Sequence, residues 1–273
     1  MMVPSAKDTL LVSLFSVVPK EWTSSRIGGF AASTLSGNFV RYYAWSNGID
    51  LSEAEPSDVA AYETLGALFT RALKPGARPI DRSATVTVVS PCDGEVVFAG
   101  CATGGVADIA DGRVLDLRAL LGDPRPRDED DVVVIYLSPK DYHRVHSPAD
   151  STGVPPVVHI AGERWPVRPS FMRKIESLFE RNERVSMTLQ GGDADGLTLT
   201  MVAAFGVGHM TWPDGSEVRT GPSAHPAGIE RGAWLATFGL GSTVILTAPK
   251  GRLHWDLELG RHLKLGEAIA RRP

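Results

Sequence analysis

The chain has 273 residues, enough for one large domain or two small ones around a substantial buried core. Its 28 Lys and Arg residues against 32 Asp and Glu residues give a formal net charge of −4. This balance argues against a nucleic-acid partner, because DNA- and RNA-binding domains carry an excess or a stripe of basic side chains. The two cysteines, Cys92 and Cys101, have no CxxC spacing, which excludes a zinc site and a disulfide framework and indicates a reducing compartment.

The N-terminal region, residues 1–55, predicts amphipathic helices. Residues 10–18 form a broad apolar arc with Ser13 and Ser16 opposite, and a second helical stretch covers about residues 24–45. The apolar run closes at Pro19, and no segment approaches the ~20 apolar residues that span a bilayer, so we expect neither a signal peptide nor a transmembrane segment. The region is either a lipid-facing arm or a set of helices packed on the protein, because amphipathicity alone does not separate the two.

The remainder, residues 56–273, predicts a mainly antiparallel β body, so the expected fold class is α+β. A short helix is expected around residues 62–72, and a charged, Pro-containing solvated loop at residues 122–131. Strands are expected at residues 85–90, 95–99, 132–137, 197–207, 243–247 and 253–259, and helices near residues 115–121 and 171–181.

Three segments of this body carry chemically active side chains. They are PCDG with Asp93, DYHRVHSP with His143 and His146, and GSTVI with Ser242. A serine hydroxyl becomes a nucleophile when an imidazole takes its proton and a carboxylate orients that imidazole, so Asp93, His146 and Ser242 fit a catalytic triad. The same residues also fit a turn aspartate, a pair of surface histidines and a serine at a strand entry.

Together these segments resemble the bacterial phosphatidylserine decarboxylase proenzymes of the longer, membrane-associated type. The resemblance runs nearly end to end and includes TRALKPGARPI at residues 70–80 and LFERNERV at residues 178–185. Cys92 stands where the family frequently has alanine, an exchange of small residues. Residues 212–227 look divergent, which limits what the resemblance says about lipid contacts.

The resemblance implies a lyase that cleaves itself between Gly241 and Ser242. The products would be a β-chain of residues 1–241 and an α-chain of residues 242–273, held together noncovalently by strands such as 243–247 and 253–259. In this scheme Asp93 orients His146, His146 accepts the proton of Ser242, and Ser242 becomes a covalent pyruvoyl cofactor.

The resemblance further implies that the pyruvoyl group forms a Schiff base with phosphatidylserine and that loss of CO2 gives phosphatidylethanolamine, with His143 as the proton donor. The expected location is the cytoplasmic face of the cell membrane, with peripheral attachment. A dimer of the processed protein is common in the family.

Other functions fit parts of the pattern. They are a Ser-His-Asp hydrolase without chain cleavage, a membrane-binding homologue that has lost catalysis, and a pyruvoyl decarboxylase of a soluble amino acid. The local sequence GLGSTVI does not match the G-x-S-x-G elbow of a conventional hydrolase. Lys74 and Arg78 either pair with phosphate headgroups or are solvated surface charges. No metal site is expected, because the five remaining histidines lack metal-ligand spacing; they are His159, His209, His225, His254 and His262.

Overall fold

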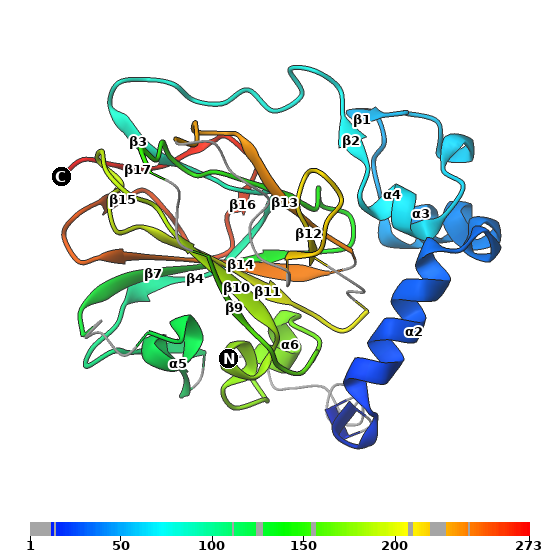
Figure 1. The fold of residues 1–273 in the computed structure, drawn as a ribbon, viewed down its shortest axis with the longest axis horizontal. Coiled ribbons are helices and arrows are strands. Elements are labelled where there is room, and N and C mark those ends of the chain that lie inside the picture. The colour runs from blue at the N-terminus through cyan, green and yellow to red at the C-terminus, as the bar shows by residue number, and fades with distance from the viewer. Residues whose placement is uncertain are drawn as a thin grey trace.

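A computed structural model describes residues 12–273, except residues 14, 111, 124–127, 154–156, 207–209, 219–227 and 240. Helices dominate the N-terminal region and β-strands dominate the rest, as Figure 1 shows. All the pairs between its named strands are antiparallel. The predicted α+β class with a mainly antiparallel body is therefore confirmed.

The N-terminal helices form an arm along one side of the body. The arm is attached to the body by the ion pair of Lys20 with Glu163 and by the packing of Phe15 on Phe171. The helix predicted for residues 24–45 is interrupted: α2 (Lys20–Ala32) is followed by a 3-10 helix (Thr34–Phe39) and then by α3 (Val40–Asn47). Figure 1 shows α2 standing beside the sheets rather than across them. Of the helix predicted at residues 10–18, residues 12, 13 and 15–17 are helical, and residues 10, 11 and 14 lie outside the described part.

This arm has a small apolar core of its own. Its buried members are Val40, Ala44, Tyr62 and Leu68. The short helix predicted around residues 62–72 is present as α4 (Leu65–Phe69), after a 3-10 turn at Val59–Ala61. The pair β1 (Ala54–Glu55) and β2 (Ala72–Leu73) closes the unit. The helical unit thus shares its core with residues beyond 55.

A seven-stranded antiparallel sheet forms the centre of the body. Its order is β16 (His262–Leu263), β4 (Gly94–Cys101), β7 (Asp130–Leu137), β14 (Ser242–Pro249), β11 (Thr198–Ala203), β10 (Arg184–Thr188) and β9 (Val157–Ile160). The central strand β14 is buried over all its residues except Pro249, which explains its apolar, β-branched sequence.

Smaller sheets and short helices complete the body. One sheet has the order β15 (His254–Trp255), β17 (Ala268–Arg271) and β3 (Val86–Val89), and another has β12 (Met210–Thr211), β13 (Trp234–Phe238) and β8 (Arg144–His146). A hairpin joins β5 (Val106–Ala110) to β6 (Arg113–Asp116). The short helices are α5 (Leu117–Leu121), α6 (Pro169–Met172) and α7 (Leu178–Arg181), and Figure 1 shows α5 and α6 below the main sheet.

The predicted strands at residues 85–90, 95–99, 132–137 and 243–247 are confirmed as β3, β4, β7 and β14. The strand predicted at 197–207 ends at Ala203, and residue 207 lies outside the described part.

Four predicted boundaries are wrong. Only His254 and Trp255 of residues 253–259 form a strand, the helix at 171–181 is split into α6 and α7, and residues 115–116 belong to β6. Asp130 and Asp131, predicted in a solvated loop, begin β7, and Asp130 is buried. In each case pairing with another strand or a local turn overrode the pattern of the segment itself.

The last part of the chain is held by strands of the rest. β14 pairs with both β7 and β11, β16 pairs with β4, and β17 pairs with β3. Residues 242–273 therefore contribute three strands that pair with residues before 242.

Candidate functional site

Ser242 starts the central strand of the main sheet. Its side chain is fully buried, and its Oγ has no hydrogen-bond partner among the described residues. Gly241, directly before it, has φ +63°, the left-handed region that favours glycine. Among the described residues, a Cβ on Gly241 would meet only the Ala204 Cβ, at 3.9 Å, so the backbone conformation rather than crowding explains the glycine.

Asp93 lies in the turn before β4 and is buried against Arg78. The Arg78 Nε donates to Asp93 Oδ1 at 2.9 Å, and its Nη2 donates to Oδ2 at 2.7 Å. The backbone N–H of Leu265 also donates to Oδ1, at 2.8 Å. Arg78 completes the cluster with an ion pair to Glu53 at 2.8 Å.

This arrangement differs from the expected roles of two residues. Within the described part, no hydrogen bond joins Asp93 to His146, and Asp93 acts on that imidazole through its charge at longer range. Arg78 is neither a solvated charge nor open to a headgroup, because its side chain is 9% exposed and faces Asp93. Burial alone would lower the pKa of Arg78, but its bonds to Asp93 and Glu53 raise it overall. Lys74, by contrast, is exposed and donates to the Ser52 carbonyl.

His146, on β8, is oriented by a backbone carbonyl. Its Nδ1 lies 2.8 Å from the Gly232 carbonyl oxygen, so this nitrogen carries the proton and Nε2 is an acceptor. The Tyr142 hydroxyl donates to Nε2 at 3.3 Å. Burial lowers the pKa of His146, which keeps the imidazole neutral at physiological pH. The residue has the protonation state of a general base.

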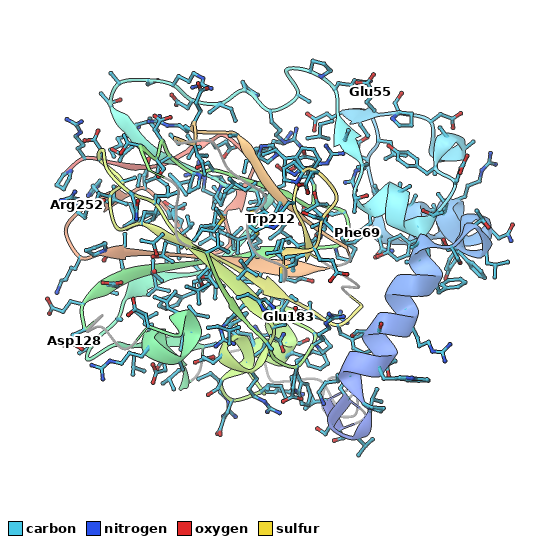
Figure 2. All side chains as sticks on the ribbon, viewed as in Figure 1. Glu55, Phe69, Asp128, Glu183, Trp212 and Arg252 are labelled. Carbon is cyan, nitrogen blue, oxygen red and sulfur yellow. The ribbon has the colours of Figure 1, made fainter. Side chains whose placement is uncertain are left out.

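His143 is fully buried beside α4. Its ring centroid lies 3.9 Å from that of Phe69. Figure 2 labels Phe69, which lies where the arm meets the body. Its Nδ1 donates to the Asp141 carbonyl at 2.9 Å, and its Nε2 has no partner among the described residues. Burial lowers the pKa of His143 to about 3. In the neutral imidazole, Nδ1 therefore donates a hydrogen bond, and the lone pair of Nε2 accepts none from a described residue.

The loop that carries His143 is held by residues that the sequence reasoning missed. Asp141 accepts hydrogen bonds from the Ser138 N–H and hydroxyl and from His262 Nε2, and Arg71 donates to the Asp141 carbonyl. Asp141 and Tyr142 lie inside the DYHRVH motif, and Arg71 lies inside TRALKPGARPI. The signal was present in these motifs, but no spacing connects them to His262.

Backbone pairing brings the histidine segment to the strand that leads into Ser242. β8 pairs with β13, and the Phe238 N–H donates to the His143 carbonyl at 3.1 Å. Gly241 and Ser242 follow Phe238 by three and four positions along the chain. No hydrogen bond between described residues joins Ser242 to either histidine.

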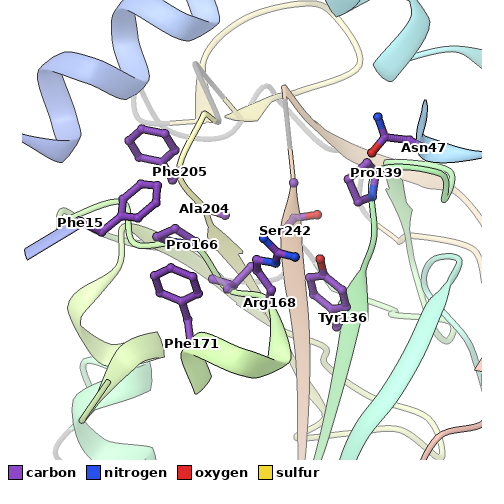
Figure 3. A pocket seen from close by; sticks show the side chains of 12 residues that line it. Phe15, Asn47, Tyr136, Pro139, Pro166, Arg168, Phe171, Ala204, Phe205 and Ser242 are labelled. Atoms are coloured by element: carbon purple, nitrogen blue, oxygen red, sulfur yellow. The ribbon is translucent and has the colours of Figure 1, made fainter. Parts of the chain in front are cut away.

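A cavity of about 410 Å³ lies beside Ser242. Figure 3 shows the side chains that line it, among them Phe171 and Ser242. Its described lining residues are Phe15, Asn47, Tyr136, Pro139, Pro166, Val167, Arg168, Phe171, Ala204, Phe205, Gly241 and Ser242. Asp93, His143 and His146 do not line it. Of the four candidate catalytic residues, all of them described, only Ser242 lies in the cavity wall.

Of the five remaining histidines, three are described. His159 bonds to Glu183 at 3.0 Å and His262 bonds to the Asp141 carboxylate at 2.9 Å, whereas His254 is exposed. His209 and His225 lie outside the described residues, as does most of the divergent segment 212–227. The described side chains form no group of three or more His, Cys, Asp or Glu that could hold a metal ion.

Large apolar side chains are exposed along the N-terminal arm. They are Val17, Trp22, Ile27, Phe30, Leu35, Phe39, Tyr42 and Trp45. Outside the arm, the described residues expose only Val114, Val158 and Leu259 of this kind. A helix long and apolar enough to cross a membrane does not occur in the described part of the chain.

Comparisons with known proteins agree with the resemblance. A family model described as phosphatidylserine decarboxylase matches residues 65–271. A phosphatidylserine decarboxylase proenzyme of Halorhodospira halophila is 38% identical over 264 residues, covering 93% of this chain and 85% of that protein. Proteins of the same name from Marinobacter nauticus and Shewanella amazonensis are 35% and 36% identical, covering 97% and 89% of this chain and 98% and 90% of their own lengths.

Proposed function

The chain belongs to the phosphatidylserine decarboxylase family of carboxy-lyases, and we propose that it cuts its own backbone between Gly241 and Ser242 and then decarboxylates phosphatidylserine to phosphatidylethanolamine. The observation that carries the proposal is the Ser242 hydroxyl, which is buried, has no partner among the described residues and lies at the wall of a cavity. An unsatisfied buried hydroxyl costs free energy. The hydroxyls of Thr243 and Thr247 on the same strand also lack a partner among the described residues, so the cavity beside Ser242 is what distinguishes it.

Self-cleavage uses the Ser242 Oγ as the nucleophile. Attack on the Gly241 carbonyl carbon forms a C–O bond, breaks the C–N bond and leaves an ester with a free amine on residue 242. β-Elimination then removes the Cα proton of residue 242 and releases the Gly241 carboxylate, which leaves a dehydroalanine. Its imine tautomer takes up water and releases ammonia, which leaves the pyruvoyl group. The left-handed conformation of Gly241 supports this step, because no Cβ hinders the carbonyl that is attacked.

We assign the base in self-cleavage to His146. Its protonated Nδ1 is fixed by the Gly232 carbonyl, so Nε2 is the nitrogen that accepts a proton. The lowered pKa keeps that nitrogen unprotonated at neutral pH. Asp93 supports this role by its negative charge, which favours the imidazolium that forms, while Arg78 fixes the position of the carboxylate.

We assign His143 to turnover of the lipid. The pyruvoyl group formed from residue 242 would supply the electron sink that loss of CO2 requires. His143 must first take up a proton before it can deliver one to the carbon that loses CO2, because its pKa of about 3 keeps it neutral. A bound anionic lipid favours this uptake, since a nearby negative charge raises the pKa of an imidazole.

After cleavage, residues 1–241 and 242–273 would stay together as a noncovalent β/α pair. The pairing of β14 with β7 and β11 supports this, because cleavage before Ser242 breaks none of those strand contacts. A dimer of such pairs is the expectation for the family.

We also propose that the N-terminal arm attaches the protein peripherally to the cytoplasmic face of the membrane. The exposed aromatic side chains of the arm support this, because tryptophan and tyrosine favour the boundary between headgroups and acyl chains. In this proposal residues 1–55 attach the protein to the membrane, and residues 56–273 form the catalytic body.

The assignment of the two histidines is tested by comparing His146→Ala with His143→Ala. The first should give an uncleaved chain. The second should still cleave, at least in part, but should lose decarboxylation of phosphatidylserine. His254→Ala, at an exposed histidine on β15, is the matched control and should behave as wild type. Cleavage by His146→Ala with none by His143→Ala would contradict the assignment.

A further inference from the structure

The cavity at Ser242 has an apolar part and a polar part. Phe15 packs edge-on against Phe171 and Phe205, with ring centroids 5.5 and 4.6 Å apart. Figure 3 shows these rings together on one side, with Ser242 and Tyr136 on the other. The first part suits an acyl chain, and the second suits the headgroup of the same lipid.

Arg168 is the single charged residue among the twelve described residues that line the cavity. Its guanidinium has no hydrogen bond and no ion pair within the described part of the chain. Figure 3 shows this side chain between the phenylalanine rings and Ser242. The positive charge of Arg168 acts on Tyr136 in the wall of the same cavity. Burial raises the pKa of Tyr136, and the charge of Arg168 opposes that rise.

The backbone of Arg168 is fixed by its neighbours. It lies between Val167 and Pro169, with φ −60° and ψ 151°, the extended conformation that a following proline favours. Pro166 lines the same wall. A side chain that starts from a fixed backbone loses less entropy when it binds a ligand.

We propose that Arg168 binds the phosphodiester of the substrate lipid and thereby sets the distance between the acyl chains and residue 242. The inference rests on the proposed function, because it takes the ligand to be a phospholipid whose serine amine reaches residue 242. In such a lipid the phosphodiester lies between the serine and the acyl chains. Arg168 occupies the corresponding position between Ser242 and the phenylalanine rings.

The serine carboxylate is the other anionic group that an arginine could bind. An ion pair to the carboxylate would be strongest before the reaction and would be lost as CO2 leaves, so it would raise the barrier to decarboxylation. The phosphodiester does not change during the reaction. Binding it equally throughout lowers KM and leaves kcat unchanged.

The test uses short-chain lipids and two matched variants. Arg168→Gln removes the charge in the cavity. Arg173→Gln removes a charge just after α6, at a residue that does not line the cavity. Dihexanoyl phosphatidylethanolamine is the binding probe, because it keeps the phosphodiester and lacks the carboxylate. Calorimetry gives its Kd, and assays with dihexanoyl phosphatidylserine give KM and kcat.

For Arg168→Gln we expect the Kd of phosphatidylethanolamine and the KM of phosphatidylserine to rise about tenfold, with kcat and self-cleavage unchanged. Arg168→Lys should recover most of the affinity, and Arg173→Gln should bind like wild type. An unchanged Kd for phosphatidylethanolamine would overturn the proposal. If the KM for phosphatidylserine rose while that Kd stayed unchanged, Arg168 would bind the serine carboxylate instead of the phosphodiester.

Failure of the proposed function has a different signature. Binding of phosphatidylethanolamine requires no pyruvoyl group, so its Kd can also be measured in the Ser242→Ala background. A wild-type chain that neither cleaves nor decarboxylates would contradict the proposed function, and the comparison of Arg168→Gln with Arg173→Gln would still decide the role of Arg168.

Discussion

Replacing Asp93 by Asn should destabilise the folded chain, because it leaves the buried Arg78 guanidinium without its principal counter-charge. The two side chains are 7% and 9% exposed, so solvent screens their interaction weakly. Removing one partner of a buried ion pair costs about 3–5 kcal/mol of unfolding free energy. Arg78 keeps its bond to Glu53, which is partly exposed, so we expect a loss of about 3 kcal/mol.

The reverse change, Arg78→Met, should cost a similar amount. It leaves Asp93 with the Leu265 N–H as its one remaining described partner. The double variant should lose less than the sum of the single losses, since neither charge is then left alone. We expect a coupling energy of about 2 kcal/mol between the two positions.

The assay is urea unfolding followed by tryptophan fluorescence, in a Ser242→Ala background that keeps the chain in one piece. The exposed pair of Arg113 and Glu176, with side chains 32% and 84% exposed, is the matched control and should show a coupling of about 0–1 kcal/mol. If Asp93→Asn and Arg78→Met were additive within about 0.5 kcal/mol, the reasoning that the ion pair fixes Asp93 would be refuted.

Three further outcomes follow from the site and the arm. His143 has a folded pKa of about 3 against an ordinary value of 6.5, so the unfolded chain binds a proton first as pH falls. Its stabilising contribution is therefore complete above pH 6.5 and declines toward pH 3, by about 1.4 kcal/mol per pH unit in unfolding experiments on Ser242→Ala. Tyr142→Phe removes the hydroxyl that bonds to His146 Nε2 and should slow self-cleavage about fivefold in a time course by mass spectrometry, which corresponds to about 1 kcal/mol. Trp22→Ala combined with Trp45→Ala should weaken binding to phospholipid vesicles at least about tenfold in a sedimentation assay.

Each of these outcomes has a control. Adding His143→Gln should remove the extra pH dependence, and an unchanged slope would contradict the buried neutral histidine. A wild-type cleavage rate in Tyr142→Phe would show that the hydroxyl does not position His146. Leu259→Ala, at an exposed leucine of the β body, should bind vesicles like wild type, and equal weakening by this variant would argue against a membrane-facing arm.

The long strands of the main sheet could be predicted because their sequence carries the signal. β7 and β14 are runs of β-branched and apolar residues between turns, as expected of strands buried on both faces. The two-residue strands β15 and β16 carry no periodicity, and they exist because distant strands pair with them. The helix predicted at 171–181 failed because a turn with Ser177 at φ +50° divides it.

Three sequence motifs predicted the candidate residues of the site. The groups that form hydrogen bonds and ion pairs with these residues could not be predicted in this way. The Gly232 carbonyl that orients His146 has no sequence signal, since every residue has a carbonyl. The pairing of Asp93 with Arg78 and that of Asp141 with His262 are tertiary contacts that local patterns do not encode. Arg168 is one arginine among many until the fold puts it on the cavity wall.

The proposed chemistry of the site depends on cleavage of the chain between Gly241 and Ser242. The most direct test is the intact mass of the purified wild-type protein and of Ser242→Ala under denaturing conditions. We predict two wild-type fragments that divide at residue 241/242, the smaller one blocked to N-terminal sequencing and reactive toward carbonyl reagents, and a single chain for Ser242→Ala. A single unmodified chain from catalytically active wild-type protein would contradict the account and would direct attention to a serine hydrolase that works without chain cleavage.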